Sequence, residues 1–171
     1  PTKIILENAI KPLLIEPEQL HAELDPDTLL IHVADAAAYA QAHIPGALLV
    51  EPRELVCGVP PATGRLPEAA QLQALFHRLG YDPANPERLI VAYDDEGGGW
   101  AGRFLWTLDI IGHTKWGYLN GGIQAWTEAG YAVERGVGNL ETVDDAQSSE
   151  SNLPAKLNIN TQPIAELEDV L

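Results

Sequence analysis

A short acidic, glycine-rich segment is the place in this sequence where chemistry is most expected. Residues 94–99 read DDEGGG and follow an apolar run at residues 89–93 that is typical of a strand buried on both faces. Apolar residues at helical spacing come next, so the segment lies between the carboxyl end of a strand and the start of a helix. Backbone N–H groups at such a place favour an anion, and open parallel sheets bind ligands at this edge. The segment offers carboxylates and glycines but no nucleophile.

A dinucleotide site is one alternative for this segment. Gly97, Gly99 and Gly102 satisfy the G-x-G-x-x-G spacing after a strand and before a helix. Residues 94–96, however, place three negative charges where a pyrophosphate would lie, and each close like-charge contact costs about 1 kcal/mol in water. The acidic ribose partner expected about 20 residues later is missing, and Asn120 stands near that place. Both facts disfavour a dinucleotide.

A metal site is a second alternative. The adjacent carboxylates Asp94, Asp95 and Glu96 have the oxygen ligands that Mg²⁺ or Ca²⁺ binds. Such a cluster is more often a solvated turn that caps a helix, because carboxylates favour helix N-termini. The five histidines show no zinc spacing. We therefore expect no metal and no cofactor.

The composition restricts the partners of the chain. Lys and Arg total 10 against 25 Asp and Glu, for a net charge of −15. Such a surface repels nucleic acid and anionic membranes, and no apolar run approaches the ~18 residues of a membrane-spanning helix. The single cysteine, Cys57, cannot form an internal disulfide, which favours a reducing, cytoplasmic location. The sequence lacks methionine, so we expect that Pro1 is not the translation start.

Strands that alternate with helices are expected to position the DDEGGG segment. The predicted strands cover residues 13–15, 28–33, 48–50, 89–93 and 115–119. The first helix is expected to begin at Pro17, with Leu20 and Leu24 on its inward face. This alternation predicts an α/β fold with a mostly parallel sheet that is covered on both faces.

Local signals predict the ends of two further helices. Asp35 is a suitable N-cap for a short alanine-rich helix. A long loop rich in proline and glycine is expected over residues 51–65. The next helix is expected to begin at Pro67 and to end at Gly80.

The strand-and-helix pattern stops near the end of the chain and then resumes. Residues 1–135 are predicted to form one domain, and the acidic, serine-rich residues 136–156 a linker. Residues 157–171 repeat the strand-then-helix pattern of the first predicted elements and end at Leu171. We therefore expect residues 157–171 to be the truncated start of a second, similar domain.

Several motifs in order carry a family resemblance. Residues 43–47 read HIPGA, residues 119–126 read LNGGIQAW, and residues 129–131 read AGY. Together with the DDEGGG segment and its strand, these motifs resemble the rhodanese (thiosulfate sulfurtransferase) family over about residues 13–133. Residues 93–103, YDDEGGGWAGR, are similar to the N-terminal domain of a tandem-domain rhodanese.

The resemblance implies both a fold and a chemistry. The implied fold is a five-stranded, mainly parallel sheet flanked by helices on both faces. In active members, a cysteine opens the loop, takes sulfur from thiosulfate as a persulfide and passes it to cyanide or another thiophile. Loop N–H groups at a helix N-terminus suit that role, because they lower a thiol pKa from about 8.5.

The resemblance also implies that this copy of the loop lacks its nucleophile. Asp94 stands at the usual cysteine position, with Asp95 as the alternative, so no residue here is expected to be catalytic. The arginine that usually ends the loop is replaced by Trp100, and Arg103 lies a turn further on. The candidate loop and anion pocket consists of Asp94, Asp95, Glu96, Gly97, Gly98, Gly99, Trp100 and Arg103.

Residues outside the loop have simpler interpretations. His32 stands where the family often has an acid, and Ala34 where it often has an arginine, as expected of a domain freed from catalysis. Cys57 is interpreted as an incidental thiol rather than a sulfur carrier. His43 is expected to fix a turn through a side-chain hydrogen bond.

The four tryptophans divide into two predicted classes. Trp106 and Trp126 are expected in the core, because they have helical spacing to other apolar residues. Trp100 and Trp116 are the candidates for packing against a second domain.

Two functional hypotheses follow from the sequence. The first is the non-catalytic N-terminal domain of a thiosulfate sulfurtransferase. Its partners are a catalytic C-terminal rhodanese domain in the same chain and, for the whole protein, thiosulfate and a thiophilic acceptor, with neither nucleic acid nor membrane. The alternative is a rhodanese-like interaction or regulatory module without activity.

Overall fold

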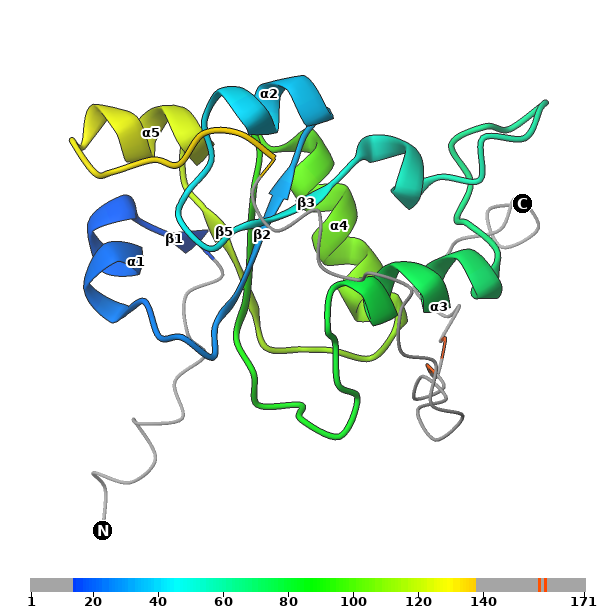
Figure 1. Ribbon diagram of the computed structural model, residues 1–171. Coiled ribbons are helices and arrows are strands. Elements are labelled where there is room, and N and C mark those ends of the chain that lie inside the picture. The colour runs from blue at the N-terminus through cyan, green and yellow to red at the C-terminus, as the bar shows by residue number, and fades with distance from the viewer. Residues whose placement is uncertain (1–13, 138–156, 158, 160–171) are drawn as a thin grey trace, which may run out of the picture.

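Five parallel strands form the centre of the molecule (Figure 1). The computed structural model describes residues 14–137, 157 and 159. The sheet has the order β1-β5-β4-β2-β3. Its strands are β1 Leu14–Ile15, β2 Leu29–Val33, β3 Leu48–Val50, β4 Ile90–Tyr93 and β5 Trp116–Leu119. The predicted α/β class and parallel sheet are confirmed.

Helices cover both faces of this sheet. Alternate residues of the buried strands point to opposite faces, as the pleat requires, so that Ile31 and Leu30 belong to different core clusters. One face carries α1 Pro17–Glu23, α2 Ala36–Gln41 and α5 Gly122–Glu128. The opposite face carries α3 Ala69–Arg78 and α4 Gly99–Ile110, whose Phe76 and Phe104 pack together. The chain therefore diverges to opposite faces after the neighbouring strands β2 and β4.

Some sequence expectations need correction. Leu24 does not join Leu20 in the core, because α1 ends at Glu23 and the Leu24 side chain is 40% exposed. The predicted loop over residues 51–65 begins with a 3-10 helix, η1 Pro52–Leu55, which a capping box stabilises. The helix expected at Pro67 begins two residues later, at Ala69. The Asp35 cap is confirmed, since its Oδ1 accepts a 2.7 Å hydrogen bond from the Ala38 N–H.

The described residues near the C-terminus contact the first core. Leu157 is buried against the cluster formed by α3, α4 and the sheet, and its N–H donates to Gln73 Oε1 at 2.9 Å. Ile159 packs on the same cluster. The rest of the predicted linker and second repeat, residues 138–156, 158 and 160–171, lies outside the described residues. Among the helices that are described, none is long and apolar enough to cross a membrane.

Candidate functional site

The predicted loop lies at the carboxyl edge of the sheet, between β4 and α4 (Figure 1). Strand β4 is buried along its whole length, because its four residues lie between β5 and β2 and are covered on both faces. The loop leaves this strand at Asp94 and enters α4 at Gly99. The structure therefore brings the candidate loop residues together around the N-terminus of α4, where the sequence placed them.

The Asp94 carboxylate binds the N–H groups of its own loop. Its Oδ1 accepts hydrogen bonds from the N–H of Gly98 at 2.8 Å and of Glu96 at 3.2 Å. Its Oδ2 accepts one from the N–H of Ala101, in the first turn of α4, at 3.0 Å. Asp94 is 2% exposed, so these bonds form away from solvent. The anion that the loop favours is thus supplied by the protein itself.

Glycines allow the loop to wrap this carboxylate. Gly97 and Gly98 adopt positive φ angles of 87° and 97°, which a side chain would strain. Gly98 also leaves no room for a Cβ, because that atom would lie 2.7 Å from the Tyr118 hydroxyl oxygen. A Cβ at Gly122 would collide with the carbonyl oxygen of Asp94. The LNGG motif and the DDEGGG segment therefore meet through their backbones, and the Ile123 N–H donates to that same carbonyl at 3.2 Å.

Arg103 does not act as an anion clamp for the loop. Its Nε donates to the Leu55 carbonyl at 3.2 Å and its Nη2 to the Gly64 carbonyl at 2.9 Å. Its guanidinium lies 4.6 Å from the ring centroid of Trp106. The side chain therefore joins α4 to the loop that follows η1.

The structure separates the two tryptophans that were predicted to lie in the core. Trp106 is only half-buried, beneath Arg103, so its prediction is wrong, whereas Trp126 is 2% exposed as expected.

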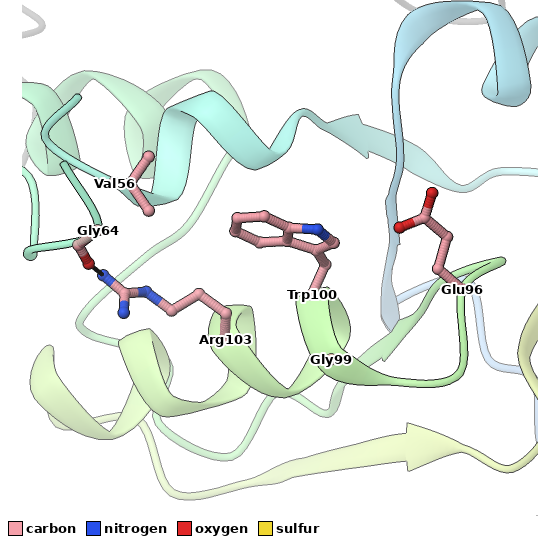
Figure 2. A pocket seen from close by; sticks show the side chains of 6 residues that line it. All are labelled: Val56, Gly64, Glu96, Gly99, Trp100 and Arg103. Carbon is pink, nitrogen blue, oxygen red and sulfur yellow. Dashed lines mark hydrogen bonds between the residues drawn. The ribbon is translucent and has the colours of Figure 1, made fainter.

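A hollow of about 410 Å³ lies beside the loop. Figure 2 shows the Trp100 indole between the Arg103 side chain and the Glu96 carboxylate. The residues that line the hollow are Val56, Gly64, Glu96, Gly99, Trp100 and Arg103. It is therefore a partly apolar recess with one cation and one anion at its rim.

Other candidate groups lie apart from the loop or serve the fold. Cys57 lies in the loop after η1, where its Sγ donates to the Ala62 carbonyl at 3.4 Å. His43 donates a hydrogen bond from Nδ1 to the Tyr39 carbonyl at 2.8 Å, and its ring stacks on the Tyr39 ring. This is the turn-fixing contact expected for His43. No group of three or more His, Cys, Asp or Glu side chains that could hold a metal ion occurs in the described part of the chain.

Sequence reasoning missed a second feature beside the loop. His32, on β2, lies fully buried with Nε2 3.9 Å from Oδ1 of Asp95. Burial raises the pKa of Asp95, and the like charge of Glu96 adds to this rise. The signal in the sequence was a histidine within an otherwise apolar strand, but its contact depends on the order of the strands.

Comparisons with known proteins agree with this geometry. Residues 16–129 match the family model of the rhodanese-like domain. A thiosulfate sulfurtransferase of Pseudomonas aeruginosa is 51% identical over 127 residues, which are 74% of this chain and 46% of that protein. A thiosulfate sulfurtransferase of Azotobacter vinelandii is 52% identical over 116 residues, which are 67% of this chain and 42% of that protein.

A solved structure shows the same fold. SseA of Escherichia coli, a 3-mercaptopyruvate sulfotransferase, superposes with a TM-score of 0.73 at 21% identity, over 94% of this chain and 60% of that one. The present chain spans less than half the length of the two curated relatives. By its family match and these relatives, the chain belongs to the rhodanese family.

Proposed function

We propose that this chain is the non-catalytic N-terminal domain of a thiosulfate sulfurtransferase. The catalytic cysteine is then in a second rhodanese domain, later in the same polypeptide. The observation that carries the proposal is the Asp94 carboxylate, which accepts hydrogen bonds from two loop N–H groups and one N–H group of α4. By the family resemblance, Asp94 stands at the position of the cysteine. A carboxylate oxygen cannot carry a sulfane sulfur, so this loop has no group that could form the persulfide.

On this proposal, the whole protein uses the chemistry of the family's active members. A cysteine thiolate attacks the outer sulfur of thiosulfate, the S–S bond breaks, and sulfite leaves with the electron pair. The persulfide then passes its outer sulfur to cyanide or another thiophile, which regenerates the thiolate. In this chain, the loop N–H groups that would stabilise such an anion already bind Asp94.

Two features support a second domain as the partner. The chain covers 46% and 42% of the two thiosulfate sulfurtransferases, so each relative has as much sequence again. Trp100 is half-buried in a recess beside the loop, which suits packing against another domain. On this proposal, residues 136–156 link the domains and residues 157–171 begin the second one, with Leu157 and Ile159 in contact with the core of the first domain.

The single cysteine, Cys57, supports a reducing compartment such as the cytoplasm.

An assay of sulfur transfer from thiosulfate to cyanide tests the proposal. The 171-residue chain is expected to show no turnover above the uncatalysed rate. The Cys57→Ala variant is assayed beside it, to separate any activity of the incidental thiol from activity of the loop. Turnover that survives Cys57→Ala would overturn the claim that the domain is non-catalytic.

The encoded sequence beyond Leu171 separates the two functional hypotheses. A second HIPGA-like motif, followed by a strand and a cysteine loop, is the expected result. A stop codon or an unrelated domain there would instead favour an interaction or regulatory module without a catalytic partner in the same chain.

A further inference from the structure

His32 is a buried polar side chain that the loop chemistry leaves unused. It is 1% exposed, and neither Nδ1 nor Nε2 has a hydrogen-bond partner. Its ring stacks on Tyr93 with centroids 4.4 Å apart and lies 5.8 Å from the ring of Tyr39. Buried polar atoms without partners destabilise a fold. A hydrogen-bond partner for either ring nitrogen would remove this destabilisation.

Asp95 is placed to become that partner. Its Oδ1 lies 3.9 Å from His32 Nε2, about 1 Å beyond the length of a charge-assisted hydrogen bond. The Asp95 side chain is 30% exposed, so solvent protons reach it, whereas His32 is buried. The two residues lie at the ends of neighbouring strands whose following helices, α2 and α4, cover opposite faces. Ligands of open parallel sheets bind where the chain diverges in this way.

Burial brings the proton affinities of His32 and Asp95 closer together. Burial lowers the pKa of His32 to about 4, with a further lowering by His43 that Asp94 opposes. Burial raises the pKa of Asp95 above its ordinary value. The other titratable groups that face the pair are Tyr93 and Asp94 at the end of β4, Glu96 in the loop, Asp35 and Tyr39 of α2 and its cap, and His43, whose Nε2 lies 3.5 Å from Glu134 Oε2. At neutral pH, His32 is therefore a neutral imidazole.

We propose that His32 and Asp95 bind a single proton between them, and that its uptake closes their 3.9 Å gap to a hydrogen bond and draws Asp95 inward. The proton comes from solvent, and the pair changes from a neutral imidazole and a carboxylate to a species with no net charge. No other group gains or loses a proton. Because Asp95 directly follows Asp94, this closure moves the peptide groups whose N–H atoms Asp94 binds. The pair is then a proton-operated latch on the loop.

Nuclear magnetic resonance of the 171-residue chain tests the latch. The ring nitrogens of His32, the side-chain carboxyl carbon of Asp95 and the amides of Glu96 and Gly98 are followed as the pH is lowered. All are expected to move in one step with a common midpoint. Asp95→Asn is expected to lower the His32 midpoint by at least about 1 unit, because it removes the anion. It also removes the step at the loop amides.

Glu134→Gln is the matched control, because the Glu134 carboxylate lies beside a different buried histidine, His43. It should leave the common step in place. Separate midpoints for His32 and Asp95 would overturn the latch. So would a His32 midpoint that Asp95→Asn leaves unchanged.

A second experiment works at neutral pH and avoids acid unfolding. His32→Gln supplies a permanent N–H donor toward Asp95, whereas His32→Leu supplies none. The loop amides of the glutamine variant are expected to move toward their low-pH positions, and those of the leucine variant are not. Equal amide positions in the two variants would contradict the proposal.

Discussion

Asp94 and Asp95 are adjacent and carry the same functional group, yet the fold treats them in opposite ways. Asp94 points into the loop, is 2% exposed and accepts three backbone hydrogen bonds. Asp95 lies beside His32 of β2, where burial raises its pKa and His32 donates no hydrogen bond to it. The same charge is thus stabilised at one position and penalised at the next.

The difference follows from which backbone groups face each side chain. A loop that enters a helix presents free N–H groups on its inner side, and Asp94 lies there. Burial raises the pKa of Asp95, the nearby carboxylates of Glu96 and Asp35 add to this rise, and a hydrogen bond from its own backbone N–H offsets the rise only in part. A loop built to bind one anion therefore does not stabilise a second anion one residue away.

The largest expected effect comes from removing the Asp94 carboxylate. Asp94→Ala leaves three N–H groups without acceptors, two of them in the loop and one in α4, and should lower the free energy of unfolding by about 4 kcal/mol. Urea unfolding measures this loss. The control is Glu96→Ala in the same loop, which should change the free energy by less than about 0.5 kcal/mol because no hydrogen bond there depends on its side chain. Equal losses in both variants would break the contrast.

The next effect is the pH dependence that His32 imposes. Its pKa is about 4 in the fold against 6.5 in the unfolded chain, so the unfolded chain binds more protons between these values. Stability should therefore fall as the pH is lowered from 6.5 to about 4, by about 3 kcal/mol in all from this group. Urea unfolding at several pH values measures the slope, which His32→Leu should flatten. A slope that His32→Leu leaves unchanged would assign the acid sensitivity to other groups.

A cysteine placed in turn at each position reads the two environments directly. In a Cys57→Ala background, Asp94→Cys should have a thiol pKa about 2 units below the ordinary 8.5, because the loop N–H groups stabilise the thiolate. Asp95→Cys should have a thiol pKa at or above 8.5, because carboxylates surround it. Thiolate absorbance against pH measures both values. The reverse order would show that the N–H groups do not favour an anion at Asp94.

Much of this arrangement could be predicted from the sequence, and the remainder depends on tertiary contacts. The apolar run of β4 and the glycines after it placed the loop at a helix N-terminus, because strand length and helical spacing are local signals. For Asp94, the sequence predicted a helix-capping role but not the burial of its carboxylate inside the loop. The pairing of His32 with Asp95 needs β2 beside β4, and no local pattern gives the order of strands. Leu24 was misplaced because helical spacing does not mark where α1 ends.

The smallest expected effect is the most direct test of the contrast, because it makes one chemical change at both positions. Asp95→Asn should change the free energy of unfolding at neutral pH by no more than about 0.5 kcal/mol, and toward greater stability, since the side chain is partly exposed and its raised pKa means that the fold disfavours its charge. Asp94→Asn should cost about 2 kcal/mol, because the amide keeps one acceptor oxygen for three N–H donors and turns an NH₂ group toward them. Urea unfolding of the two variants side by side measures the difference. A loss at Asp95 as large as that at Asp94 would mean that the fold stabilises both charges and that the two sides of the loop are alike.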